Sequence, residues 1–128
     1  IRDPEMSRGL GDVYKRQCAD AGASCELFQS NHEGAIVDRI QQAWFDGVDG
    51  IVMNPAAYTH TSVAILDALK ATAIPTVEVH ISDVSTREAF RHHSYVSLAA
   101  KHTIIGHGID GYREGIEWLA RELRAGRL

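Results

Sequence analysis

Short runs of apolar residues alternate along this chain with segments in which apolar residues recur every three or four positions. The apolar runs lie at residues 24–29, 50–54, 74–81 and 103–105. Short apolar runs of this kind, bounded by turn residues, are typical of buried strands. Because these strands alternate with helical segments, the chain predicts an α/β fold with a mostly parallel sheet.

Helical periodicity fills the intervals between these runs. Ile36, Ile40 and Trp44 lie four residues apart, which places all three on one face of a helix. Thr61 or Ser62 can cap the start of a second helix, since either hydroxyl can accept from a backbone N–H of the first turn. The predicted helices span residues 33–45, 61–69, 86–93 and 111–124.

The N-terminal residues 1–17 do not fit this alternation. They offer isolated apolar residues among charges and glycines, where an α/β domain normally opens with a buried strand. Residues 13–21 are expected to end a first helix, with Gly22 as its stop signal. We therefore expect residues 1–17 to be foreign to the domain or disordered, and residues 18–128 to form a single incomplete domain.

The bulk composition narrows the class of protein. Apolar residues make up 45% of the chain and charged residues 23%, which is typical of a soluble globular domain. A net charge of −4 argues against nucleic acid or an anionic membrane as a partner, because both attract clustered Lys and Arg. No apolar run reaches the ~18 residues of a membrane span, so a cytoplasmic protein is expected. Cys18 and Cys25 lack CxxC spacing and are expected to be reduced thiols.

Polar side chains gather where three predicted strands end, at residues 29–34, 54–62 and 78–82. Taken singly, such residues have structural explanations: Asn54 before Pro55 is a common turn, and a strand-end histidine is usually hydrogen-bonded within the fold. In an open parallel sheet, however, ligands bind at the carboxyl ends of the strands. Three such ends that all carry amide, imidazole or carboxylate groups therefore predict a polar binding pocket.

Five sequence blocks make a more specific pattern, in the order FQSNHEG, NPAAYTHTSVA, EVHIS, REAFRHHSYVS and IIGHGIDGY. In order and spacing, these blocks resemble those of the type II 3-dehydroquinate dehydratases, from about Ser24 to the C-terminal helix. The resemblance implies a flavodoxin-like three-layer sandwich whose parallel sheet has strand order 2-1-3-4-5, with the first strand missing or replaced in this chain. It also implies an enzyme that eliminates water from 3-dehydroquinate through an enolate, in aromatic amino-acid biosynthesis (the shikimate pathway) or in quinate catabolism.

The resemblance implies catalytic roles for three residues. His80 in EVHIS is similar to the general acid that protonates the departing hydroxyl, and Glu78 resembles its acidic partner. Imidazole suits this role because it can hold a proton near neutral pH and still release it. Asn54 in NPAAY is similar to the asparagine that holds the substrate and an ordered water near the developing enolate.

Further positions match substrate-binding residues of the family. The backbone N–H groups of Ile81 and Ser82 are expected to hold the substrate carboxylate. His60 matches a substrate-binding histidine, and Arg91 matches an arginine that contacts the substrate hydroxyls. Asp67 occupies the place of a residue that reaches the active site of a neighbouring subunit, since the resemblance implies trimers that assemble into a dodecamer.

Arg87 matches another arginine of the family, for which an ion pair and a substrate contact are both open interpretations. The seven histidines raise the question of a metal site. No HExxH motif is present, and the adjacent His92 and His93 would point in different directions on a helix, so no metal is expected. Neither a GxGxxG motif nor a P-loop occurs, and the implied reaction needs no cofactor.

The catalytic base of the family lies in a segment that this sequence does not match. There, an RxPxxYG lid carries the tyrosine that removes the substrate proton and an arginine that lowers the pKa of that tyrosine. Residues 2–7 (RDPEMS) place Ser7 where the tyrosine would stand. We therefore expect this chain to keep the acid, to lack the base and to be impaired in turnover. Two alternatives are a non-catalytic flavodoxin-like module that binds a small polyhydroxy acid or assembles with itself, and a metal-dependent hydrolase on the same fold.

Overall fold

The computed structural model describes the backbone of residues 4–128 and the side chains of residues 9–128. The helices are α1 (Pro4–Asp20), α2 (Glu33–Phe45), α3 (Val63–Thr72) and α4 (Asp110–Arg124). The strands are β1 (Ile51–Met53), β2 (Thr76–His80) and β3 (His102–Ile105). Short 3-10 turns lie between them: η1 (Ala56–His60), η2 (Val84–Thr86), η3 (Ala89–His92) and η4 (Val96–Leu98). No helix in this described part of the chain is both long and apolar enough to cross a membrane.

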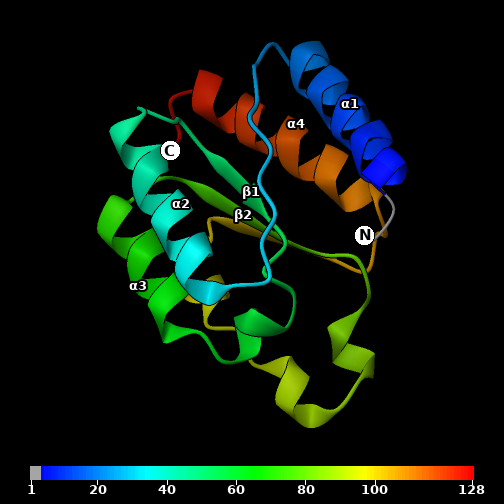
Figure 1. Cartoon of the computed structure of the whole chain (residues 1–128), viewed down its shortest axis with the longest axis vertical. Coiled ribbons are helices and arrows are strands. Elements are labelled where there is room, and N and C mark those ends of the chain that lie inside the picture. The colour runs from blue at the N-terminus through cyan, green and yellow to red at the C-terminus, as the bar shows by residue number, and fades with distance from the viewer. Residues whose placement is uncertain (1–3) are drawn as a thin grey trace.

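The strands form one parallel sheet in the order β1-β2-β3. Val52 of β1 lies opposite Val77 of β2, and Val77 lies opposite His102 of β3. Helices cover both sides of the sheet, with α4 and α1 on one side and α2 and α3 on the other (Figure 1). The predicted α/β fold with a parallel sheet is confirmed, and these strands correspond to the last three positions of the predicted strand order.

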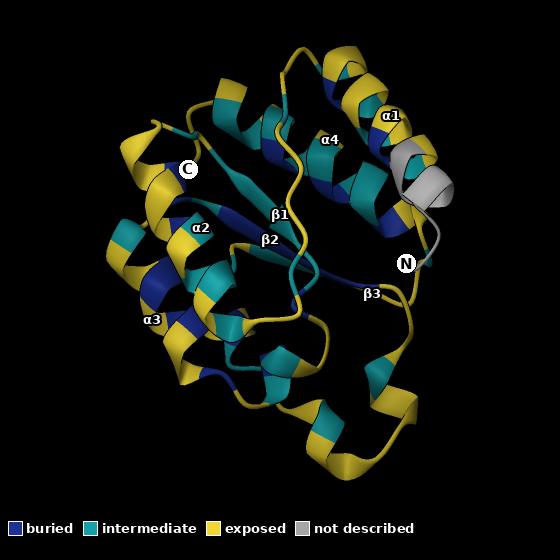
Figure 2. Ribbon diagram, viewed as in Figure 1, coloured by how far each residue is buried: buried dark blue, intermediate teal, exposed yellow. Residues whose placement is uncertain are grey.

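Strand β2 lies at the centre of this sheet, and all five of its residues are buried (Figure 2). Val77 and Val79 pack with Ile104 and Leu119 in an apolar cluster beneath α4. Gly115 allows α4 to lie close to the sheet, because a Cβ at this position would be 3.2 Å from a valine methyl group of β1. The intervening residues of β2 point to the opposite face of the sheet, since successive side chains of a strand alternate.

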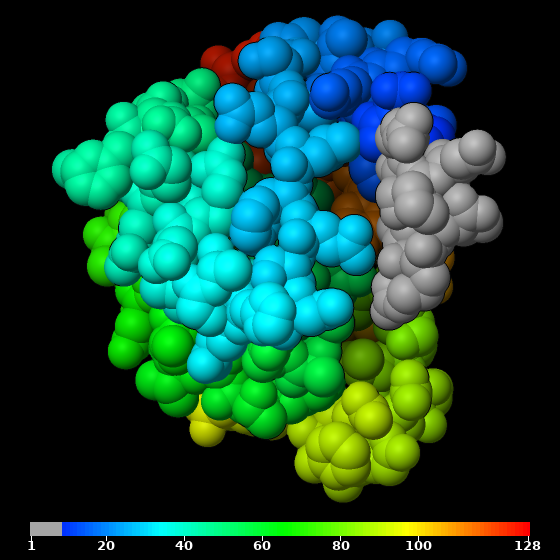
Figure 3. All heavy atoms as spheres, viewed as in Figure 1, coloured from blue at the N-terminus to red at the C-terminus, as the bar shows by residue number. Residues whose placement is uncertain are grey.

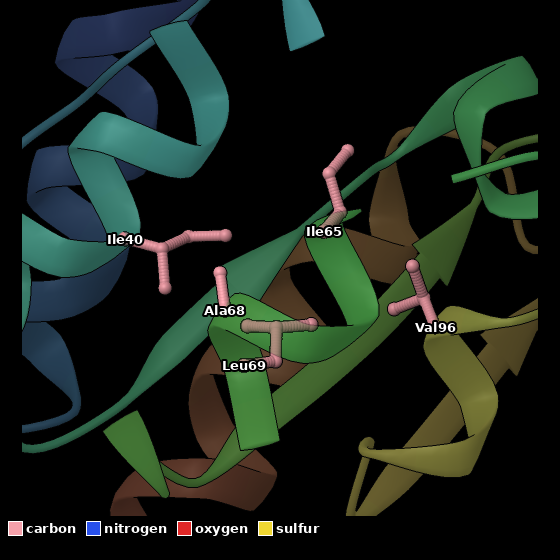
Figure 4. Close-up of a cluster of buried hydrophobic side chains, with 5 residues drawn as sticks. All are labelled: Ile40, Ile65, Ala68, Leu69 and Val96. Atoms are coloured by element: carbon pink, nitrogen blue, oxygen red, sulfur yellow. The ribbon is translucent and has the colours of Figure 1, made fainter. Parts of the chain in front are cut away.

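A second apolar cluster fills the space between α2, α3 and η4. Its buried members are Ile40, Ile65, Ala68, Leu69 and Val96. In Figure 4, Ile40 points from α2 toward Ala68 and Leu69 of α3. The predicted apolar face of α2 is therefore confirmed at Ile40. It is wrong at Trp44, which is 57% exposed and meets the neighbouring Phe45 ring edge to face.

The predicted helix boundaries are close to those in the structure. Helix α2 begins and ends at the predicted residues, and α4 begins one residue earlier than predicted. Of the two candidate caps of α3, Ser62 rather than Thr61 fills the role: its hydroxyl accepts from the backbone N–H of Ile65 at 2.9 Å. Gly22 follows the end of α1 with a left-handed φ of +78°, as a helix stop requires.

Helix α1 covers most of the segment that we expected to be foreign or disordered. Within α1, Cys18 is buried, and both Cys18 and the half-buried Cys25 are free thiols, as predicted. Burial, together with the neighbouring Cys25 thiol, raises the pKa of Cys18 to about 12, so this thiol stays protonated at neutral pH. The foreign origin of residues 1–17 stays a prediction, and residues 1–3 lie outside the residues that the structure describes.

The predicted strand at residues 24–29 is wrong, because the structure has no strand there. The segment runs between α1 and α2, and its light-blue atoms cover part of the face shown in Figure 3. Leu27 and Phe28 within it are 49% and 51% exposed. A strand forms only beside another strand that completes its hydrogen bonds, and the segment does not pair with β1, which is an edge of the described sheet.

The predicted helix at residues 86–93 is also wrong. The 3-10 turns η2 and η3 take its place, separated by extended backbone at Arg87, where φ is −103° and ψ is −167°. Phe90, the large apolar residue of this segment, is 62% exposed. A short segment without an apolar face packed on the protein gains too little to form a longer helix.

We expect Ser62→Ala to destabilise the fold by about 1 kcal/mol, because the substitution leaves the backbone N–H of Ile65 without its cap. The measurement is the free energy of unfolding in urea at neutral pH. Thr61→Ala, at the exposed neighbouring position, is the matched control and should have a much smaller effect. Equal effects of the two substitutions would show that Ser62 is not the cap.

Candidate active site

His80 and Glu78 form a buried pair at the carboxyl end of β2. They are two residues apart on one strand, so both side chains point to the same face of the sheet. His80 Nε2 lies 2.5 Å from Glu78 Oε2, and the two residues are only 5% and 0% exposed. A charged carboxylate at such a position needs several hydrogen-bond donors, because it has lost its water.

Hydroxyl groups from other segments supply further hydrogen bonds to this carboxylate. Thr59 donates from Oγ1 to Glu78 Oε2 at 2.9 Å, and Ser94 donates from Oγ to the same oxygen at 2.7 Å. Thr103 donates to Oε1 over a longer 3.4 Å. The sequence analysis missed these three residues. The signal that could have found them is Glu78 itself, since a carboxylate in a buried strand requires donors from nearby loops.

These hydrogen bonds keep Glu78 ionised. Burial by itself raises the pKa of Glu78, because the charged form loses its hydration. The hydrogen bonds from His80, Ser94 and Thr59 outweigh burial and hold the pKa of Glu78 below the usual value of a glutamate. His80 therefore lies against a carboxylate that carries its charge at neutral pH.

Asn54 follows β1 and is held by two hydrogen bonds. Its Oδ1 accepts from the backbone N–H of Ala56 at 2.9 Å, and its Nδ2 donates to the Tyr112 hydroxyl at 2.9 Å. Ala56 has a φ of +51°, an uncommon conformation for a residue with a Cβ, which the bond from Asn54 helps to hold. Tyr112 in turn contacts Tyr14 of α1, with ring centroids 5.1 Å apart. The Asn54 amide keeps one further N–H for a ligand.

The loops that follow β2 and β3 meet beside His80. The backbone N–H of Gly106 donates to the carbonyl oxygen of His80 at 3.0 Å, and that of Gly108 donates to Ile81 at 3.0 Å. Ile81 and Ser82 are both exposed at this end of the sheet. The backbone N–H groups that were predicted to bind a carboxylate therefore belong to an exposed loop next to the buried imidazole.

His60 and Arg91 belong to a second group, carried by η1 and η3. His60 Nδ1 lies 2.7 Å from the carbonyl oxygen of His93, and its ring meets the Phe90 ring edge to face at 6.5 Å. The guanidinium carbon of Arg91 lies 4.9 Å from the Phe90 ring centroid, and its Nε donates to Glu88 at 2.5 Å. Because η1 also carries the threonine that binds the buried carboxylate, it connects this group to the acid pair.

Two predicted residues lie apart from these groups. Asp67 is exposed on α3, and Arg87 is exposed between η2 and η3. The carbonyl oxygen of Arg87 lies 3.1 Å from His92 Nε2, a contact that involves the backbone and not the guanidinium. The roles predicted for both side chains stay predictions.

A groove of about 510 Å³ lies along β3 and α4. Its walls include the stacked rings of His102 and Trp118, 4.6 Å apart, and the pair formed by His107 and Glu114. None of the residues predicted for the site lines this groove, so its volume does not mark the polar site. Within the side chains that the structure describes, no three His, Cys, Asp or Glu residues are grouped so that they could hold a metal ion.

The fold and the acid pair together define a class of protein. An imidazole held by a buried carboxylate at the carboxyl end of a parallel strand is suited to general acid–base chemistry. The amide and backbone N–H groups beside it can bind an anionic substrate. The class that these features define is a small α/β protein with a site suited to acid–base chemistry.

Comparisons with known proteins identify the family within this class. Residues 5–120 match the family described as Dehydroquinase class II, and the chain belongs to this family. A 3-dehydroquinate dehydratase of Cereibacter sphaeroides is 58% identical over 116 residues, which cover 87% of this chain and 78% of the relative. Catabolic 3-dehydroquinase 1 of Aspergillus terreus is 55% identical over 124 residues, which cover 93% and 81%. The resemblance inferred from the five sequence blocks is confirmed.

A solved structure supports the same assignment. The crystal structure of a type II dehydroquinase from Butyrivibrio crossotus is similar to this chain with a TM-score of 0.84 and 47% sequence identity. The match covers 88% of this chain and 78% of that one. The family consists of hydro-lyases that dehydrate 3-dehydroquinate, so the expected enzyme class is confirmed together with the fold.

We expect Glu78 to contribute stability that disappears in acid. Its pKa is lower in the folded chain than in the unfolded chain, where it is about 4.3. The contribution is therefore complete above the unfolded value and is lost as the pH falls through the folded value. Urea unfolding at a series of pH values should show an acid-dependent loss of stability that is smaller in Glu78→Gln. The exposed Glu117→Gln is the control and should keep the full loss; the same pH dependence in all three proteins would contradict the prediction.

Proposed function

We propose that this chain binds 3-dehydroquinate at the carboxyl ends of β1 and β2 and that His80 protonates the hydroxyl that leaves as water. The observation that carries this proposal is the buried pair of His80 and Glu78, whose nitrogen and oxygen lie 2.5 Å apart. Membership of the class II dehydroquinases supports the choice of substrate, because relatives at 58% and 55% identity are named for it.

His80 has the surroundings that a general acid needs. With Nε2 against Glu78, the ring can present Nδ1 to the substrate. As the carbon–oxygen bond breaks, the Nδ1 proton passes to the leaving hydroxyl, and the electron pair of the enolate forms the new carbon–carbon double bond. Glu78 stays ionised throughout, so its charge stabilises the imidazolium before the transfer.

The remaining site residues orient the substrate in this proposal. Asn54 uses its free N–H to stabilise the enolate oxygen or an ordered water, without adding a competing base. The backbone N–H groups of Ile81 and Ser82 bind the substrate carboxylate. His60 and Arg91 contact the hydroxyl groups, and the ion pair of Arg91 with a neighbouring glutamate holds the guanidinium near the η1 turn.

We also infer a homo-oligomer that acts in the cytoplasm. Asp67 is exposed on α3, as a residue that reaches the site of a neighbouring subunit would be, and the family resemblance implies trimers that build a dodecamer.

The relatives include a catabolic dehydroquinase as well as a 3-dehydroquinate dehydratase whose name does not say catabolic. The proposed reaction, dehydration of 3-dehydroquinate, is the same in shikimate biosynthesis and in quinate catabolism.

His80→Gln should slow the conversion of bound 3-dehydroquinate by about 10²-fold or more, because the leaving hydroxyl loses its acid. The rate is measured in single turnovers from the ultraviolet absorbance of the conjugated product, and binding is measured by calorimetry. His107→Gln is the matched control, since His107 Nδ1 also lies 2.5 Å from a glutamate oxygen but on the exposed surface. Equal rates in the two variants would remove His80 from the mechanism.

The chain as given should also convert 3-dehydroquinate about 10²-fold or more slowly than the Cereibacter sphaeroides relative. The reason is that residues 2–7 place Ser7 where the lid of the family would carry its tyrosine. Binding of the substrate should be retained, because the groups proposed to bind it are present. Turnover at the rate of the relative would show that another group of this chain serves as the base.

A further inference from the structure

Three donors converge on a single oxygen of Glu78. His80 Nε2 lies 2.5 Å from Oε2, Ser94 Oγ lies 2.7 Å from it and Thr59 Oγ1 lies 2.9 Å from it. The other oxygen, Oε1, has only the longer contact with Thr103 at 3.4 Å. The hydrogen bonding is therefore concentrated on the oxygen that faces the imidazole.

The two hydroxyl oxygens lie unusually close together. Thr59 Oγ1 and Ser94 Oγ are 2.5 Å apart, and each hydroxyl has one proton. At this separation one hydroxyl can also donate to the other, so the two hydroxyls and Glu78 Oε2 form one hydrogen-bonded group. Because each hydroxyl can donate to Oε2, the group can support a carboxylate at this position.

The hydroxyls are not needed to hold the two segments together. The backbone N–H of Tyr95 donates to the carbonyl oxygen of Thr59 at 2.7 Å, and this bond joins η1 to the segment before η4 without either hydroxyl. Thr59 is 0% exposed, so water cannot replace Glu78 as the acceptor of its hydroxyl. The Thr59 hydroxyl thus serves the carboxylate, whereas the Ser94 hydroxyl both donates to the carboxylate and accepts from the backbone N–H of Ser97 at 3.1 Å.

We propose that Thr59 and Ser94 are positioning residues for the acid of this site. Their hydroxyls keep Glu78 ionised and fix Oε2 against His80 Nε2, so that the imidazole, and not the carboxyl, holds the proton that is delivered to the substrate. This role rests on the proposed function of His80. It does not require either hydroxyl to touch the substrate.

The experiment follows the carboxyl carbon of Glu78 and the ring nitrogens of His80 by NMR across a pH titration of the full chain. The variants are Thr59→Val and Ser94→Ala, which remove one hydroxyl each. Each should raise the pH at which Glu78 takes up its proton by about one unit, because a hydrogen bond to the charged form is lost. The ring-nitrogen signals of His80 show in the same spectra whether Nε2 still faces Oε2 of Glu78.

Conservative and unrelated substitutions separate this role from a structural one. Thr59→Ser and Ser94→Thr keep the hydroxyl and should restore the titration of the natural sequence. Thr72→Val removes a hydroxyl that bonds within α3, at 3.0 Å from the carbonyl oxygen of Ala68, and should leave the titration of Glu78 unchanged. If Thr59→Val fails to fold, Ser94→Ala at the half-buried position provides the same test.

An unchanged Glu78 titration in Thr59→Val and Ser94→Ala would overturn the proposal. A shift that the serine and threonine exchanges fail to restore would do the same, because it would trace the effect to packing. These outcomes do not depend on turnover. Failure of the proposed function would instead be seen as equal conversion rates in His80→Gln and His107→Gln. The Glu78 titrations of Thr59→Val and Ser94→Ala are measured independently of those rates.

Discussion

A carboxylate buried in the middle of a sheet is the constraint on which the rest of this structure depends. Glu78 is 0% exposed, and an ion in such a place is stable only where several donors reach it. The donors come from β2 itself, from η1 and from the segment before η4. Both connecting segments must therefore return to one face of β2. Because one buried charge requires these donors, η1 and the segment before η4 both lie over the carboxyl end of β2, where the polar residues gather.

Successive side chains of β2 point to opposite faces of the sheet, and the two faces have different roles. Val77 and Val79 belong to the apolar cluster beneath α4, whereas Glu78 and His80 point the other way. A register slip of one residue would place the carboxylate in that cluster and the valines among the hydroxyls. Both errors are costly, so packing and charge fix the same register. The strand that anchors the fold for this reason also positions the acid.

An element of this fold could be predicted where its own residues determine it, and not where it depends on a distant segment. The apolar runs at residues 50–54 and 74–81 contain β1 and β2, and the run at 103–105 covers all of β3 except His102. Strands that contribute apolar residues to a packed sheet leave such a local pattern. Residues 24–29 have a similar pattern but form no strand, since pairing depends on a neighbour that is not part of the local sequence. The helix predicted at residues 86–93 is wrong for a related reason, because its large apolar residue, Phe90, stays 62% exposed.

The contacts of the candidate site could likewise be predicted only in part. The pairing of His80 with Glu78 could be predicted, because residues two apart on a strand share a face. Thr59 and Ser94 could not, since they lie 19 and 16 residues from Glu78 in the sequence and meet it only through the fold of the loops. Sequence patterns specify which side chains share a face, but they do not specify which loop hydroxyl will reach a buried charge.

The acid side of the site is independent of the N-terminal part of the chain. Among the residues that the structure describes, the side-chain hydrogen bonds of Glu78 and His80 join residues between Thr59 and Thr103. By contrast, the family resemblance implies a base on a lid segment that this sequence does not match. A group held by the core is maintained by the same interactions that keep the chain folded, whereas a group on a lid is not. In the part of this chain that the structure describes, the acid pair therefore forms without a side-chain hydrogen bond from the segment before β1.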